Sequence, residues 1–212
     1  MTAGEAGLSP RQGDVLDAAL SLLVEAGEGF TMTALARRAS CSKETLYKWF
    51  GDRDGLLTAT VQYQAAKVRV VPVDAARLDA EGLADALTRF ATDLLTVLTG
   101  EISVALNRLA VAHAGADRRG LGAVVLQNGR HAIGRRLKPV LEAGRAAGLL
   151  DFSDAEAAFR TYFGLVVRDI QIRLMLGDQF DISAKTIAAE ATTAVEQFLV
   201  LCGTGGTGRA GA

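Results

Sequence analysis

Apolar residues recur every three or four positions along most of the chain, which is the spacing of one face of an α-helix. The first such run follows Ser9-Pro10, a favourable pair for a helix cap and first turn. Thr31 and Ser42 stand where they can cap two short helices, and a fourth pattern covers about 52–69. This first part of the sequence therefore predicts four helices, three of them short.

Pro72 separates these helices from longer helical patterns. Ser153 and Glu156 are the ends of an S-D-A-E capping box, which predicts that a helix begins there. We find no strand pattern and no internal repeat, and we expect the Gly-rich segment 204–212 to be disordered. The longer helices are expected at about 79–99, 101–114, 118–147, 154–177 and 183–202, so the predicted fold class is all-α.

The composition suits a packed protein, since 50% of the 212 residues are hydrophobic and 22% are charged. The formal net charge of −1 gives no overall attraction for a polyanion, so only local charge could favour such a partner. Cys41 and Cys202 form no C-x-x-C or Cys/His cluster, so we expect no metal and no cofactor. We find no secretory signal and no apolar stretch of roughly 18 residues, so we expect a cytoplasmic protein without a membrane partner.

One short stretch, SKETLYKWF at 42–50, combines a helix cap with many hydrogen-bonding and aromatic side chains. Leu46 and Phe50 are four residues apart, so they share a face that can anchor the helix. A short helix, a break and a second short helix are the outline of a helix-turn-helix, whose second helix enters the DNA major groove. The side chains left at or near the exposed side are Lys43, Thr45, Tyr47, Lys48 and Trp49.

The local charge favours a surface for DNA. Residues 31–53 contain five basic and two acidic side chains, a balance of 5 − 2 = +3 in a chain whose total is −1. Lysine and arginine supply affinity for phosphate, while hydroxyl groups and helix N-termini fix the register on the duplex. The alternative is an ordinary solvated charged helix, which can have the same composition.

The order of these features resembles the N-terminal region of the TetR family of transcriptional regulators, over roughly residues 9–60. The matching residues are Gly27, Thr31, Leu35-Ala36, Ser42, Thr45-Leu46-Tyr47, Phe50, and Arg53 with Leu56. The resemblance implies an N-terminal three-helix DNA-binding domain which, with its connecting fourth helix, covers 1–70. It also implies a larger helical regulatory and dimerisation domain over 71–203.

The resemblance assigns roles to single residues. Thr31, Lys43, Tyr47, Trp49 and Arg53 match positions that usually meet the phosphate backbone, and Thr45 and Lys48 match positions near base edges. Two features depart from the family pattern: Ser40-Cys41 occupies a turn that usually holds glycine and an aliphatic residue, and Glu44 replaces a small residue. A carboxylate at this place would repel phosphate but could accept a hydrogen bond from a cytosine amine.

In this family the last two helices usually form the dimer interface, which here would be residues 154–202. Both helices carry wide apolar stripes, and a helix that is apolar over much of its circumference should be buried on more than one side. The alternative is that the stripes fill the core of a single chain. The stripes contain Phe159, Tyr162, Phe163, Val166, Val167 and Ile170 in the first helix, and Ile187, Ala191, Ala194, Val195 and Phe198 in the second.

The resemblance further implies a ligand cavity among the C-terminal helices. A mostly apolar lining with a few polar groups favours an apolar or aromatic ligand of drug-like size over a phosphorylated metabolite. Packing in the core is the alternative for most of these positions. The candidates are Phe90, Leu94, Leu98, Leu109, His113, Gln127, His131, Phe159, Tyr162 and Phe163.

Signatures of catalysis are missing, since the sequence contains no G-x-S-x-G, P-loop or H-E-x-x-H motif. The only two histidines lack cysteine or carboxylate partners at ligand spacing, so we expect neither an enzyme nor a metal site. The predicted function is a DNA-binding transcriptional regulator, namely a homodimeric repressor that a small molecule releases from double-stranded operator DNA. Two alternatives stay open: a regulator without a small-molecule effector, and a helical ligand-binding or interaction protein that binds no operator.

Overall fold

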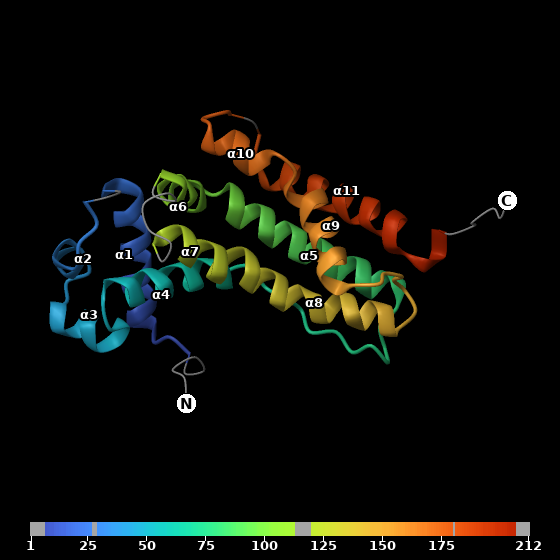
Figure 1. The fold of residues 1–212 in the computed structure, drawn as a ribbon, viewed down its shortest axis with the longest axis horizontal. Helices are drawn as coiled ribbons and strands as arrows, with labels where there is room; N and C mark the ends of the chain where they lie inside the picture. Colours follow the sequence, from blue (N-terminus) through green and yellow to red (C-terminus); the bar gives the residue numbers. More distant parts are fainter. Residues whose placement is uncertain (1–6, 27–28, 113–119, 180, 207–212) are drawn as a thin grey trace. The chain divides into compact units, whose positions relative to one another are not determined.

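The structure, a computed structural model, describes residues 7–26, 29–112, 120–179 and 181–206 (Figure 1). Within these ranges there is no β-strand, and the predicted all-α fold is confirmed. The helices are α1 (Pro10–Ala26), α2 (Met32–Arg38), α3 (Lys43–Phe50), α4 (Arg53–Ala66), α5 (Ala80–Thr99), α6 (Glu101–Ala112), α7 (Leu121–Val125), a π-helical turn (Leu126–Arg130), α8 (His131–Ala146), α9 (Ala155–Val167), α10 (Ile170–Met175), α11 (Ala184–Cys202) and a 3₁₀ turn (Thr204–Gly206).

The chain packs as two compact units, and each unit is made of two separate segments. Unit 1 consists of Met1–Ala66 and Glu101–Gly129, and unit 2 consists of Lys67–Gly100 and Arg130–Ala212. The packing therefore groups α6 and α7 with the four N-terminal helices. The predicted domains 1–70 and 71–203 do not coincide with these two packing units. As a division of the chain by function, the two domains stay a prediction.

Three predicted helix positions differ from the structure. The segment 118–147 is divided by the π-helical turn, and the segment 154–177 is broken at Arg168, whose backbone has φ 44° and ψ −129°. The S-D-A-E box does not begin its helix at Ser153. Instead Asp154 is the cap, and its carboxylate accepts a hydrogen bond from the Ala157 backbone N–H at 2.8 Å. This leaves the Glu156 side chain free of the cap, and it forms an ion pair with Lys138 at 3.0 Å.

Unit 1 is built around α1, which packs against α2, α4 and α6. Its most deeply buried side chains come from four different helices, because each amphipathic helix turns its apolar face inward. Leu106 of α6 belongs to the same hydrophobic cluster, so the core of the N-terminal helices includes a residue from the second segment. The side chains with no solvent exposure include Leu16, Leu20, Leu35, Leu46 and Leu56.

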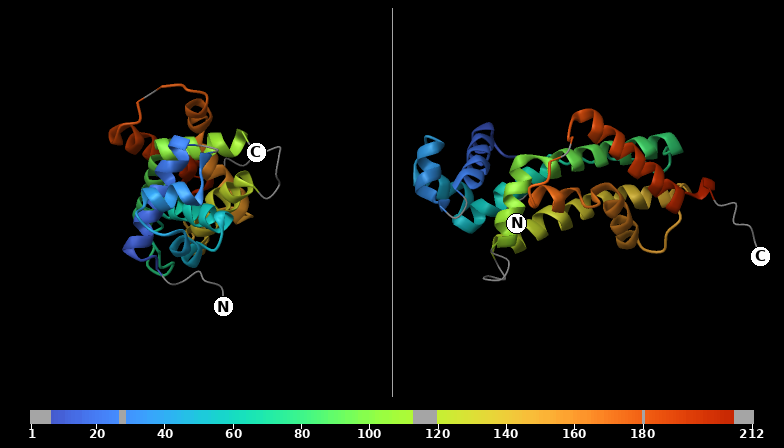
Figure 2. Two further views of the ribbon diagram at one scale, coloured as in Figure 1. Left: turned by 90° about the vertical axis from the view of Figure 1, so that its left-hand side faces the viewer. Right: turned by 90° about the horizontal axis from the view of Figure 1, so that it is seen from above.

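Unit 2 is a bundle in which α5 packs against α11 and α9 against both α8 and α11, and the right-hand view of Figure 2 shows these helices running alongside one another. Tyr162 of α9 is fully buried, and its hydroxyl donates a hydrogen bond to the Leu87 carbonyl of α5 at 2.6 Å. Phe198 of α11 meets the Tyr162 ring edge-on at 5.3 Å between ring centroids. Gly134 lets α8 approach α9 closely, since a Cβ there would lie 2.7 Å from the Phe159 ring.

The segment that follows α4 is fixed within unit 2 by three interactions. Val68 is fully buried, and the Arg136 guanidinium donates a hydrogen bond to its carbonyl at 3.0 Å. Arg69 forms an ion pair with Asp93 of α5 at 2.9 Å, which lowers the pKa of the Asp93 carboxyl.

Of the helices described, none is by itself long and apolar enough to cross a membrane, and only α5 and α6, taken together as a bent pair, meet the same criteria.

Candidate nucleic-acid interface

The α2–turn–α3 segment is held by local hydrogen bonds that the sequence predicts. The Thr31 hydroxyl accepts from the Ala34 N–H at 3.1 Å, and the Ser42 hydroxyl accepts from the Thr45 N–H at 3.1 Å. Both residues therefore cap the helices they were expected to begin. Arg11 of α1 donates to the carbonyls of Ala39 and Ser40, which satisfies acceptors left open at the end of α2.

Ser40 occupies its place in the turn at a cost in backbone strain. Its φ is 49°, in the left-handed region where a side chain costs roughly 1 kcal/mol relative to glycine. The Cys41 N–H still closes the end of α2 by donating to the Ala36 carbonyl at 3.0 Å. The turn thus keeps its hydrogen bonding although serine stands where the family usually has glycine.

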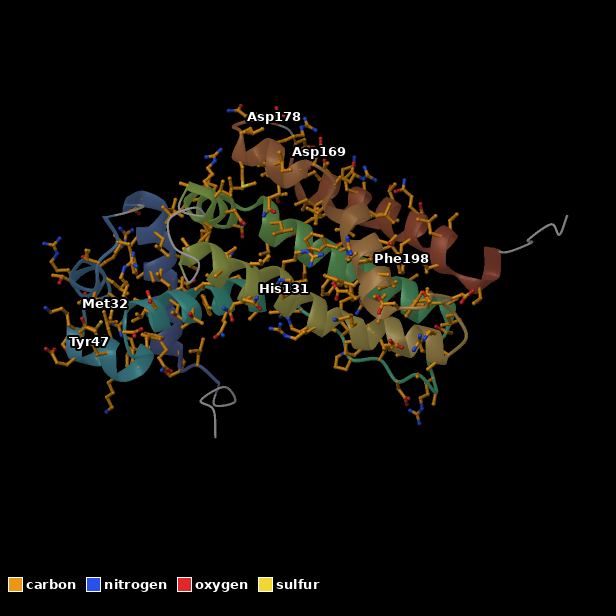
Figure 3. The ribbon with its side chains drawn as sticks, in the orientation of Figure 1. Met32, Tyr47, His131, Asp169, Asp178 and Phe198 are labelled. Carbon is orange, nitrogen blue, oxygen red and sulfur yellow. The ribbon has the colours of Figure 1, made fainter. Side chains whose placement is uncertain are left out.

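The exposed face of α3 carries the cationic and hydroxyl groups predicted to meet DNA. Lys43 and Lys48 are exposed, and Tyr47 keeps 49% of its surface accessible, as its position in Figure 3 illustrates. Leu46, on the opposite face, is fully buried and fixes the helix to the core of unit 1. Thr45 is half-buried, and its hydroxyl lies 3.1 Å from that of Ser42.

Trp49 lies differently from the other residues predicted to contact DNA. Its side chain packs against the core cluster of unit 1 and meets the Phe50 ring edge-on at 6.2 Å between centroids. Its indole therefore supports α3 from inside, and only its outer part is available to a phosphate. A phosphate contact by Trp49 remains a prediction.

The basic residues around α3 differ in whether they already interact with another side chain of the protein. Arg38 forms a bidentate ion pair with Glu25, at 2.5 and 2.7 Å, which raises the pKa of the guanidinium. Arg53 lies 6.0 Å from the centre of the Phe30 ring. Arg37 is exposed and makes no ion pair with any of the described residues, so it is a further candidate for phosphate contact. The sequence indicated Arg37 only through the local charge.

Both acidic residues of this segment are turned toward helix N-termini. The backbone N–H of Glu44 and then the Ser42 hydroxyl stabilise the ionised carboxylate, which lowers the pKa of Glu44. Asp52 accepts a hydrogen bond from the Gly55 N–H at 2.7 Å, at the start of α4. Their negative charges thus lie where the helix dipole favours them, which weakens their repulsion of a phosphate backbone.

Gly55 is a residue that sequence reasoning missed. A Cβ at this position would lie 2.1 Å from the Phe50 carbonyl oxygen, because the first turn of α4 passes directly over the end of α3. The only sign of this close approach in the sequence is a glycine in the first turn of a helix. Glycine also occurs at that position in helices that no other backbone approaches, so the sign is not specific. The close approach fixes the start of α4, where Arg53 lies, against the end of α3.

The candidate ligand residues are distributed over both units. Phe90, Leu94, Phe159 and Tyr162 are buried in the core of unit 2, while Leu98, Phe163 and His131 are half-buried there. Leu109 and Gln127 belong to unit 1, where Gln127 is exposed, and His113 lies outside the described residues.

The structure adds one residue to this group. The guanidinium carbon of Arg130 lies 5.4 and 5.2 Å from the ring centres of Phe159 and Phe163, a cation–π arrangement. The pocket as a whole remains a prediction.

The apolar stripes of the last two helices prove to be core. In α9, Phe159, Tyr162 and Val166 are buried within unit 2, and in α11 so are Val195 and Phe198. The reason is that α5, α8, α9 and α11 enclose one another on more than one side. These stripes therefore give no evidence for a dimer interface, and dimerisation through residues 154–202 remains a prediction.

Comparisons with known proteins agree with an N-terminal helix-turn-helix followed by a helical C-terminal region. Residues 15–60 match the family model described as bacterial regulatory proteins of the tetR family, and residues 85–203 match the AefR-like transcriptional repressor, C-terminal domain. A TetR transcriptional regulator from Agrobacterium tumefaciens is 50% identical, with coverage of 94% of this chain and 97% of that chain and a TM-score of 0.76.

Two further solved structures are similar. The flavonoid-responsive regulator FrrA is 28% identical, with coverage of 92% of this chain and 97% of that chain and a TM-score of 0.67. A TetR-family protein from Mesorhizobium loti, 22% identical over 93% of this chain and 100% of that chain, shares the fold with a TM-score of 0.71.

No curated protein matches the chain. The similar proteins are transcriptional regulators and not enzymes, as the sequence predicts. The helix-turn-helix, the helical C-terminal region and these similarities show that the chain belongs to the TetR family of transcriptional regulators.

Proposed function

We propose that the protein is a repressor that binds operator DNA through α3 and leaves it when a small molecule binds. The observation that supports operator binding best is the exposed cationic face of α3, opposite the buried Leu46. The second helix of a helix-turn-helix enters the major groove, with its N-terminal residues near base edges. In this proposal the backbone contacts come from Thr31, Lys43, Tyr47, Trp49 and Arg53, and the base contacts from Thr45 and Lys48.

The proposed repressor acts as a homodimer through residues 154–202. TetR-family regulators dimerise, and a two-fold protein matches two operator half-sites one DNA turn apart. The outer faces of α9 and α11 support this arrangement because each exposes several small residues among larger ones, and small side chains let two helices approach closely. These residues are Ala157, Thr161 and Gly164 in α9, and Ala188, Ala189 and Thr192 in α11.

Removing single groups from α3 tests the operator contact. Tyr47→Phe should weaken binding to all operator sequences by about 1 kcal/mol, because the hydroxyl would lose a hydrogen bond to phosphate. Lys43→Ala should weaken binding similarly and reduce the slope of log affinity against log salt by about one unit. Titration of the DNA upstream of the gene by electrophoretic shift, at several salt concentrations, measures both effects.

The matched control is Lys185→Ala, which removes an exposed lysine from the start of α11 and should leave both quantities unchanged. Wild-type affinity and salt slope in both α3 variants would refute docking through this helix. A failure of the wild-type protein to bind the DNA would instead favour the alternative of a helical interaction protein.

The effector in this proposal is an apolar or aromatic molecule. Two observations support it: the candidate lining is mostly apolar and aromatic, and a similar protein is described as flavonoid-responsive. A ligand that prefers the state unable to bind DNA must stabilise the protein and lower operator affinity together. We therefore expect compounds that raise the melting temperature also to release the operator.

A thermal-shift screen beside a DNA-release assay checks this expectation. Release by sugar phosphates or nucleotides alone would refute an apolar effector. Stabilising compounds that never change operator affinity would favour a regulator without a small-molecule effector.

A further inference from the structure

A cleft opens in unit 2 where α9 ends and α10 begins, with a volume of about 170 Å³. Its apolar wall is formed by Leu95 of α5, Ile170 of α10 and Ile187 of α11. Its remaining lining is largely charged and includes Asp169 and Asp181. None of the residues predicted to hold the effector lines this cleft, so it is distinct from the candidate effector pocket, although most of its lining lies within 154–202, the segment proposed for dimerisation.

The two arginines that line the cleft are already paired. Arg168 forms an ion pair with Glu190 at 3.0 Å, and Arg173 forms one with Asp178 at 2.6 Å. Because the charges within each pair compensate one another, the pairs contribute little net charge to the cleft. The charge that remains comes from the carboxylates of Asp169 and Asp181.

The two remaining carboxylates differ in their surroundings. Asp181 accepts hydrogen bonds from the hydroxyls of Thr186 and Ser183 and from the Ser183 N–H, groups that carry no charge, and the pKa of Asp181 is lowered. The Asp169 carboxylate accepts no hydrogen bond from any residue in the described part of the chain. Arg173, one turn along α10, is a cation that acts on it at a distance. The cleft thus combines an apolar wall with net negative charge.

We propose that this cleft binds a small organic ammonium ion. The apolar group lies against Leu95, Ile170 and Ile187, and the ammonium group donates hydrogen bonds to Asp169 and lies in the field of Asp181. The size of the cleft fits this class of ligand, since an apolar cavity of about 150 Å³ holds a benzene molecule. A carboxylate or phosphate ligand is disfavoured because both uncompensated charges are negative.

The position of the cleft gives such a ligand a structural effect. Its lining comes from α5, from the α9–α10 junction and from the first turns of α11, so a bound molecule contacts all three at once. Asp169, labelled in Figure 3, directly follows Arg168, whose backbone adopts a conformation that residues with side chains rarely adopt. A ligand here would stabilise the junction between α9 and α10 in this conformation.

Three probes of one shape test the proposal on the full chain. Benzylamine, benzyl alcohol and benzoate differ mainly in the charge of the polar group, and ligand-observed NMR titration gives a Kd for each. We expect a Kd on the order of 1 mM for benzylamine, as its few heavy atoms allow, and no saturable binding of benzoate. Equal binding of benzylamine and benzyl alcohol, or binding of benzoate alone, would overturn the proposal.

Two variants locate the bound amine. Asp169→Asn should weaken benzylamine binding about five- to tenfold, because a charge-assisted hydrogen bond becomes a neutral one. Asp85→Asn is the matched control, since Asp85 is an exposed aspartate of the same unit that forms a surface pair with Arg89 at 3.6 Å. An unchanged Kd in Asp169→Asn, or the same loss in Asp85→Asn, would count against the site.

A bulky substitution gives an independent test. Ile182 lines the cleft and is 41% exposed, so Ile182→Trp should fill part of the space and abolish benzylamine binding without disturbing the core. Ile172→Trp is the control, because Ile172 is 58% exposed on α10 but does not line the cleft. Retained binding in Ile182→Trp would refute this location. These results are independent of operator binding, so the proposal can fail while the proposed function stands.

Discussion

Replacing Gly55 by alanine is expected to destabilise unit 1 by about 2–4 kcal/mol and to abolish operator binding. The added Cβ would lie 2.1 Å from the Phe50 carbonyl oxygen, and this neighbour is backbone that no rotamer change can move away. The end of α3 and the start of α4 must therefore separate, which displaces the recognition helix from its anchor. Thermal unfolding followed by circular dichroism, with an operator titration at low temperature, measures both effects.

The matched control is Gly13→Ala in α1 of the same unit. The nearest heavy atom to a Cβ there is the Tyr63 hydroxyl oxygen at 3.9 Å, so alanine fits without strain. Alanine in place of glycine inside a helix stabilises by about 1 kcal/mol. The two substitutions should thus change stability in opposite directions. A Gly55→Ala protein as stable as Gly13→Ala and with normal DNA binding would contradict the close approach of α4 to α3.

Replacing Phe198 by alanine is expected to reduce the stability of unit 2 by about 3–5 kcal/mol, the usual cost of removing a buried aromatic ring. Phe198 is fully buried and meets the Tyr162 ring at 5.3 Å, so its loss leaves a cavity among α5, α9 and α11. A residue that only served a dimer interface would behave differently, giving a stable monomer. Unfolding curves measured together with sedimentation separate these outcomes.

Two other substitutions complete this test. Val200→Ala, on the same helix but 76% exposed, should change stability by less than about 0.5 kcal/mol. Gly164→Arg, on the outer face of α9 where a Cβ meets nothing within 4 Å, should separate the proposed dimer and leave each copy folded. A folded monomer from Phe198→Ala, or an unchanged dimer from Gly164→Arg, would place the interface elsewhere.

The features that the sequence predicted well depend on neighbouring residues. Thr31 and Ser42 were identifiable as caps because a cap bonds to a backbone N–H three residues on, which the sequence order shows. The same reasoning missed the cap at Asp154 by one residue, since Ser153 and Asp154 are both good cap residues and the sequence alone does not choose between them. The local sequence does not predict the helix break at Arg168, because arginine is rarely found with the positive φ that it adopts there.

Other features depend on which helices become neighbours. A wide apolar stripe shows that a helix is buried on several sides, but it does not show whether the neighbours belong to the same chain. Val166 and Phe198 were therefore compatible with a dimer interface or with a core, and the structure places them in the core. The partial burial of Trp49 was not evident from the sequence for the same reason, since its packing depends on the core beneath α3, and its contact with DNA stays a prediction.

The two-segment construction of the units has a consequence for synthesis on the ribosome. The four N-terminal helices emerge first, but their unit also contains α6 and α7, so it is complete only after Gly129 has been added. Leu106 cannot enter the core of α1 and its neighbours before its own helix has been made. Residues Lys67–Gly100, made earlier, must in turn wait for α11 before α5 is covered. A chain cut anywhere before α11 therefore leaves α5 without its partner.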